Sequence, residues 1–157
     1  MTELPPLMRD QRKIDADQLR LLSLFHFVVA GFAVIGLGFL FLHWLMMHTL
    51  LGSPNTWKNA PNAPNPREFM RAFRWFYLIF GACTIVAGTL NAFSGWLIRM
   101  RRARTFSLVV AGLNSMGFPM VTALSVFTFV VLLRDSVVEL YAVAAAEKAP
   151  PMPNTQV

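Results

Sequence analysis

The stretch NSMGFPM, residues 114–120, decides how the C-terminal half of this chain folds. It interrupts an apolar run over residues 105–133. As a single helix, this run would be about 43 Å long and would be kinked at Pro119, because proline cannot donate a backbone hydrogen bond. In the other interpretation, Asn114, Gly117 and Pro119 form a turn, and two short helices return the chain to the side from which it came.

Composition assigns the chain to the integral membrane proteins. Of its 157 residues, 55% are hydrophobic and only 14% are charged, and the apolar residues fall in long blocks separated by short polar stretches. A soluble domain would instead alternate apolar and polar residues with the period of a strand or a helix. We therefore expect an all-α integral membrane protein that forms one small helical bundle.

Positive charge is concentrated beside the apolar blocks. The chain has 14 Lys and Arg against 8 Asp and Glu, which gives a formal net charge of +6. In a soluble protein this excess would suggest nucleic acid as a partner, but basic residues that flank apolar blocks indicate lipid headgroups and membrane topology. The expected partner is therefore the lipid bilayer, and nucleic acid is not expected.

The first span is expected within residues 21–51, which contain no formal charge. Asp15 and Gln18 are spaced like a capping box, so the helix should begin near Ala16. Its apolar part would be about 46 Å long and exceeds the ~30 Å thickness of the hydrocarbon layer, so the helix must tilt or protrude. The run is also too long for the apolar region of a cleaved signal peptide, which favours a retained span.

A second span is expected over residues 73–98. Trp75 and Trp96 would lie about 32 Å apart along this helix and would mark the two membrane interfaces. The segment before the span is rich in asparagine and contains four prolines: Pro54, Pro61, Pro64 and Pro66. Because proline disfavours helix, residues 52–72 are predicted to form an extracytoplasmic loop.

The distribution of Lys and Arg favours a turn over a kinked helix in residues 105–133. With a turn, ten basic residues lie on the cytoplasmic side and four outside, whereas a single crossing gives eight and six. Basic residues concentrate on the cytoplasmic side of membrane proteins. We therefore expect four membrane-inserted helices, the last two forming a short hairpin, with three spans and a Pro-kinked third as the alternative.

This topology divides the chain into three regions. Residues 1–14 are expected to be a flexible cytoplasmic N-terminus, residues 15–141 a single transmembrane helical domain, and residues 142–157 a flexible tail. Both termini are placed in the cytoplasm, because this orientation keeps most of the basic residues inside.

Small residues recur along both predicted spans. Gly81, Gly88 and Gly95 follow one another at intervals of seven residues, and Gly31 belongs to a group of small residues in the first span. Small side chains on one helix face let another helix approach closely, which is a main source of association energy in lipid. We interpret these glycines as helix-packing residues within the chain, and a dimer face is the alternative.

Residues that could perform chemistry are few. The three histidines all belong to the first span, and His43 and His48 point about 140° apart on a helix, which does not suit one metal ion. None of the three apolar segments contains Asp or Glu, the usual carriers of protons through a bundle. Cys83 has no second cysteine to pair with and is interpreted as a small hydrophobic residue. We predict neither an enzyme nor a metal or cofactor site.

Two stretches carry a family resemblance. LRLLSLFHFVVAG at residues 19–31 and FPMVTALSVFTFVVLLRDSVVELY at residues 118–141 resemble a family of small, largely uncharacterised bacterial membrane proteins. In that family's pattern Pro119 and Thr122 keep their places, while Val121 and Ser125 stand where the family tends to have glycine. The resemblance implies a multi-pass protein of the bacterial cytoplasmic (inner) membrane and supplies no catalytic residues.

Three functions are compatible with these features. The leading hypothesis is a non-enzymatic accessory or scaffold subunit that acts by helix association, as a homo-oligomer or within a larger membrane complex. The second is a passive channel or small-solute transporter with a hydrated path lined by four polar residues: Thr84, Asn91, Asn114 and Thr128. The third is a haem-associated or redox-associated subunit that uses His26 or His43. His26 lies in the F-H-aromatic motif of the resemblance and is the preferred functional histidine.

Overall fold

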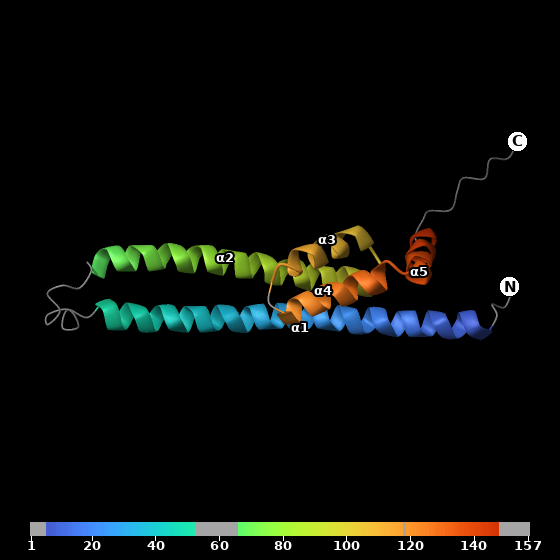
Figure 1. Ribbon diagram of the computed structural model, residues 1–157, viewed down its shortest axis with the longest axis horizontal. Coiled ribbons are helices and arrows are strands. Elements are labelled where there is room, and N and C mark those ends of the chain that lie inside the picture. The colour runs from blue at the N-terminus through green and yellow to red at the C-terminus, as the bar shows by residue number, and fades with distance from the viewer. Residues whose placement is uncertain (1–5, 53–65, 118, 148–157) are drawn as a thin grey trace, which may run out of the picture. The chain divides into compact units, whose positions relative to one another are not determined.

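The computed structural model describes residues 6–52, 66–117 and 119–147, and this part of the chain is helical, with short turns between some of the helices (Figure 1). The helices are α1 (Pro6–Gly52), α2 (Pro66–Arg99), α3 (Arg104–Asn114), α4 (Pro119–Leu132) and α5 (Asp135–Ala146). The all-α fold class is therefore confirmed. The chain divides into two compact units, each described by itself below.

The central unit consists of the described residues between Val29 and Leu90. Here α1 and α2 run antiparallel, since Ala33 lies against Gly88 and Leu40 lies against Gly81. A Cβ atom added to Gly88 would lie 2.8 Å from the Cβ of Ala33, so a larger residue at position 88 would force the helices apart. Close approach at small residues is the usual way in which helices pack in lipid.

The outer surface of the central unit is strongly apolar. Large side chains on both helices are more than half exposed, among them Phe32, Val34, Phe39, Ile79 and Val86. Two segments, Asp10–Leu51 and Met70–Arg99, are long and apolar enough to cross a membrane, or three if α4 and α5 together count as one span bent by 71°. Two apolar candidate spans are thus established, and the four-helix insertion stays a prediction.

The terminal unit consists of the described residues up to Val28 and from Asn91 onward. Its core is made by one end of α1, the last turns of α2 and the three short helices. The fully buried side chains include Leu22, Ile98, Val110, Leu132 and Val137. These apolar residues come from all five helices, so the terminal unit has a core to which every helix contributes.

Residues 104–132 form two helices and not one. α3 ends at Asn114, and the Gly117 N–H donates to Asn114 O at 3.0 Å in the turn that follows. The Arg104 guanidinium donates to Leu132 O at 3.3 Å, which joins the start of α3 to the end of α4. α3 and α4 therefore pack as an antiparallel hairpin. Pro119 is the first residue of α4, where its missing N–H costs no helical hydrogen bond.

Several helix boundaries differ from the sequence expectations. α1 begins at Pro6 and not near Ala16, so Asp15 lies inside the helix and does not cap it. α2 begins at Pro66, so residues 66–72 are helical and only residues 53–65 of the expected loop lie outside the described residues. A proline at the first position of a helix has a φ angle that already suits the helix. Residues 142–146 of the expected tail belong to α5.

The end of α2 has an unusual residue in its left-handed position. The Arg101 N–H donates to Ile98 O at 3.0 Å and the Arg102 N–H donates to Leu97 O at 2.9 Å, which is the hydrogen-bond pattern of a Schellman motif. Arg101 has a φ of 52°, where glycine is the usual residue. Ala103, two residues later, also has a positive φ, of 47°. The connection between α2 and α3 is therefore strained.

Candidate functional site

Four polar side chains meet in the core of the terminal unit, one from each of the first four helices. We call this group the His26 cluster: His26 of α1, Asn91 of α2, Asn114 of α3 and Thr128 of α4. Asn91 and Asn114 form a reciprocal amide pair, with N–H···O distances of 3.1 and 2.8 Å. His26 Nδ1 lies 3.0 Å from Asn91 Oδ1, and His26 Nε2 lies 3.4 Å from Thr128 Oγ1.

The amide pair determines the direction of the hydrogen bond to the histidine. Asn91 Oδ1 accepts from the Asn114 amide, so it also accepts from His26, and the His26 ring carries its hydrogen on Nδ1. The Thr128 hydroxyl has a single hydrogen and lies closer to Leu124 O, at 2.7 Å, than to His26 Nε2. The contact between Thr128 and His26 is therefore the weakest in the cluster.

Tight backbone packing surrounds the His26 cluster. The Ser23 hydroxyl donates to Gly95 O at 2.7 Å, one turn from His26 and Asn91. A Cβ atom added to Gly95 would lie 3.0 Å from Ser23 O and 3.2 Å from the Cβ of His26. Gly95 thus allows the approach of α1 and α2 that lets the His26 ring reach Asn91.

These contacts bear on two hypotheses drawn from the sequence. Both ring nitrogens of His26 face polar atoms of the same chain, so in this arrangement neither is directed toward a cofactor. Three of the four residues proposed to line a hydrated path, Asn91, Asn114 and Thr128, do come together, but they are buried and hydrogen-bonded. The fourth, Thr84, belongs to the central unit and donates to Phe80 O of its own helix. The geometry therefore favours a structural role for these residues.

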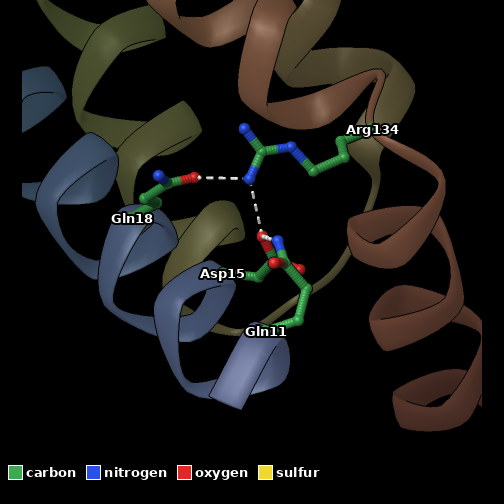
Figure 2. Close-up of polar contacts among 4 residues, drawn as sticks. All are labelled: Gln11, Asp15, Gln18 and Arg134. Carbon is green, nitrogen blue, oxygen red and sulfur yellow. Dashed lines mark hydrogen bonds and ion pairs between the residues drawn. The ribbon is translucent and has the colours of Figure 1, made fainter. Parts of the chain in front are cut away.

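A second cluster of the terminal unit is ionic. Figure 2 shows Gln11, Asp15 and Gln18 of α1 gathered around the guanidinium of Arg134. Arg134 donates to Asp15 Oδ1 at 2.9 Å and to Gln18 Oε1 at 3.1 Å, and Gln11 donates to Asp15 Oδ1 at 3.2 Å. The Asp15 side chain is fully buried, whereas that of Arg134 is 36% exposed. Oxygen Oδ2 of Asp15 is buried without a hydrogen-bond partner in the described part of the chain.

Arg134 occupies the break between α4 and α5. Its extended backbone, with φ −66° and ψ 133°, lets α5 turn away from α4 by 71°. A second ion pair, between Arg12 of α1 and Glu139 of α5, has an N···O distance of 3.0 Å and is solvent-exposed. The two pairs together attach α5 to the first part of α1.

The remaining predicted residues lie in several places. Gly81, Gly88 and Gly95 all contact α1, whereas Gly31 is exposed and a Cβ added there would meet no atom within 4 Å in the described structure. A packing role for Gly31 would therefore require a second chain or another protein. Gly117 lies in the turn between α3 and α4, where an added Cβ would be 3.2 Å from Asn114 O.

The other histidines and the cysteine are in the central unit. His43 Nδ1 lies 2.6 Å from the Tyr77 hydroxyl, and the His48 ring contacts that of Trp44. Cys83 is exposed. Among the residues that the structure describes, no group of three or more His, Cys, Asp or Glu side chains could hold a metal ion.

Comparison of the chain with protein-family models, with curated proteins and with solved structures finds no match. The resemblance to small bacterial membrane proteins therefore remains a prediction that depends on the quoted motifs.

Sequence reasoning missed the Asp15–Arg134 pair. The signal available was that Gln11, Asp15 and Gln18 are spaced four and three residues apart, which places them on one face of a helix. We interpreted Asp15 and Gln18 as a helix start, and nothing in the local pattern indicates a partner 119 residues away. Recognising that α1 already begins at Pro6 would have made this polar face visible.

The reciprocal amide pair predicts a measurable coupling. In a double-mutant cycle of Asn91→Ala and Asn114→Ala, the coupling energy should be about 0.6–1.7 kcal/mol, the range found for side-chain hydrogen bonds between membrane helices. Unfolding of the detergent-solubilised protein by a denaturing detergent would measure it. Thr89→Ala is the matched control, because the Thr89 hydroxyl donates only within its own helix. If the losses of stability in the two single variants simply add in the double variant, the two asparagines are not coupled and the hydrogen-bonded pair is contradicted.

The buried carboxylate predicts an asymmetry between the partners of the ion pair. Arg134→Gln should lower the free energy of unfolding by about 2 kcal/mol, because it leaves the Asp15 charge buried, with a discount for the partial exposure of Arg134. Asp15→Asn should cost less, since the amide oxygen still accepts the same hydrogen bonds. Arg12→Gln, which breaks the exposed pair, should cost below about 0.5 kcal/mol. If all three variants lose the same free energy of unfolding, the Asp15 carboxylate is exposed to solvent and not buried.

Proposed function

We propose that this protein is a non-enzymatic integral protein of the bacterial cytoplasmic membrane that acts as an accessory or scaffold subunit through helix association. One observation carries the proposal: among the described residues, one face of α1 packs against α2, and another face that contains glycines is left uncovered. Residues Ala33 and Leu40 contact α2, while the opposite face of the same helix segment is uncovered in the described structure.

The uncovered face has the composition of a helix-association surface. Gly31, Val34, Gly38, Phe41 and Leu45 follow one another at intervals of three or four residues, so they form one stripe along α1. Gly31 and Gly38 meet no atom within 4 Å even if a Cβ is added, and Val34 is 70% exposed. Two glycines seven residues apart between bulky residues would let another helix approach closely. The partner is a second copy of this chain or another membrane protein.

Membrane insertion is supported by the exposed apolar surface of both candidate spans. In water this surface would remain uncovered, whereas lipid covers it without cost. The turn between α3 and α4 supports insertion of the hairpin as well, because Met116 and Met120 are 88% and 82% exposed there. α3 has 11 residues and is about 16 Å long, so the hairpin would enter only about half of the hydrocarbon layer.

The proposed topology has both termini in the cytoplasm and the hairpin entering from the cytoplasmic side. Single-cysteine variants in a Cys83→Ser background should therefore differ in their reaction with a membrane-impermeant maleimide. Glu68→Cys, at the first turn of α2, should react in intact cells, whereas Asp10→Cys and Ala145→Cys should react only after lysis. All three positions are exposed in the structure. Labelling of Ala145→Cys in intact cells would show that α4 and α5 form one bent crossing instead.

The scaffold role is tested at the uncovered glycines. The double variant Gly31→Leu/Gly38→Leu should lower association at least about tenfold, because leucine side chains would prevent the close approach of the partner helix. To measure association, a photo-reactive phenylalanine analogue replaces Val34. The crosslinked product is then separated by mass, and its yield is compared between variants. Folding of the variant should be unaffected, since neither glycine contacts another part of the described structure.

Matched controls test whether association is specific to the face that contains Gly31 and Gly38 or occurs at any exposed position of the two helices. Gly36→Leu is the control for the glycines, since Gly36 also meets no atom within 4 Å but lies about 140–160° away around the helix. Val86, which is 57% exposed on α2, is the control for the crosslinking position. The scaffold role would be refuted if the crosslinker at Val34 gave no crosslinked species. It would also be refuted if the yield were the same in every variant and at both crosslinking positions.

A further inference from the structure

The terminal unit contains a groove of about 700 Å³ between the first part of α1 and the end of α2. Three arginines line it: Arg20 of α1, Arg99 at the end of α2, and Arg101 in the turn that follows. The groove is separate from the His26 cluster, whose four residues do not line it.

Within the described residues, the positive charges of the groove exceed the negative ones. No ion pair joins Arg20, Arg99 or Arg101 to another residue in the described ranges. Asp17 is the acidic residue of the lining, so the groove has a formal charge of +2 from three guanidiniums and one carboxylate. An anionic ligand would compensate this excess. One guanidinium group can donate two parallel hydrogen bonds to the oxygens of a phosphate. A phosphate group would therefore suit this groove as a ligand.

Apart from Ser23, the rest of the lining is apolar, and its large side chains include residues that follow Arg20 along α1. Leu24, Phe27 and Ile98 belong to it, and Phe27 lies seven residues beyond Arg20, about 10 Å along the helix. Arg20 immediately precedes the uncharged run of the first candidate span, and Arg99 ends the second. If both candidate spans cross the membrane, the basic part of the groove would lie at the level of the lipid headgroups and Leu24 and Phe27 would lie toward the acyl chains.

The backbone conformation of Arg101 does not stabilise the turn, because a glycine at this position would be less strained. This residue occupies the left-handed position of the Schellman motif, with φ 52°, where glycine would be unstrained. Arg101 is one of the residues that line the groove. Strained residues persist where the side chain has a use that the surrounding structure supports.

We propose that this groove binds one anionic phospholipid, with the phosphate between Arg20, Arg99 and Arg101 and the start of an acyl chain against Leu24 and Phe27. The site requires membrane insertion but not the association surface of α1, so the two proposals can fail separately. A bound lipid of this kind would balance the positive charge between the first part of α1 and the end of α2.

Native mass spectrometry of the full-length protein in a non-ionic detergent tests the site. With equimolar phosphatidylglycerol and phosphatidylcholine, the wild type should retain phosphatidylglycerol with a preference of roughly tenfold, the size expected for one to two net basic charges near an anionic surface. Arg20→Gln/Arg101→Gln should reduce the preference to near one. Arg102→Gln should retain it, because Arg102 is exposed in the same turn but does not line the groove.

Arg101→Gly separates lipid binding from folding. Glycine suits the left-handed position, so this variant should melt at the same temperature as the wild type or higher, and it should still lose most of the preference for phosphatidylglycerol. Phe27→Ala should lower retention of phosphatidylglycerol by removing part of the apolar lining.

Three results would overturn the proposal. Equal loss of preference in Arg102→Gln would show diffuse attraction to the basic turn and not a site. A preference that Arg20→Gln/Arg101→Gln leaves unchanged would place the lipid elsewhere. Displacement of phosphatidylglycerol by an equal concentration of inorganic phosphate would show a simple anion site to which the acyl chain contributes nothing.

Discussion

The terminal unit depends on the amide pair of Asn91 and Asn114, because these two side chains link α2 to α3 where apolar packing alone would not specify a position. His26 extends the pair to α1, and its contact with Thr128 brings in α4. A buried amide that loses its partner in an apolar environment is costly, so few arrangements of these helices satisfy all the polar groups at once. Apolar side chains provide most of the contact area, and the cluster selects one arrangement.

Several polar residues of this protein are buried, and many of its large apolar residues are exposed. The interior of the terminal unit contains Asp15, His26, Asn91 and Asn114, while both candidate spans present phenylalanine, valine and isoleucine on their surfaces. An apolar surface of this extent is unusual for a water-soluble domain and suits lipid as the surrounding solvent. Because the two asparagines of the His26 cluster are hydrogen-bonded to each other, this part of the interior is better suited to holding helices together than to carrying a solute or binding a cofactor.

Two separate surfaces remain for interaction with other molecules. The outer face of α1 in the central unit has uncovered glycines between bulky residues, which suits another helix. The arginine-lined groove of the terminal unit has unbalanced positive charge beside an apolar lining, which suits a lipid. Neither surface needs a nucleophile or a metal. Both are consistent with a protein whose activity is association.

The sequence by itself determined the all-α class, the two apolar candidate spans and the seven-residue spacing of glycines, because these features depend on local composition and helical period. The turn before Pro119 was also accessible: the local residues allowed either a kinked helix or a turn, and the distribution of Lys and Arg favoured the turn. Only the tertiary structure decided the pairing of Asp15 with Arg134, the grouping of His26 with two asparagines, and the earlier start of α1. The His26–Asn91 and Asp15–Arg134 contacts join residues 65 and 119 positions apart, and a side chain's burial is not encoded by its immediate neighbours.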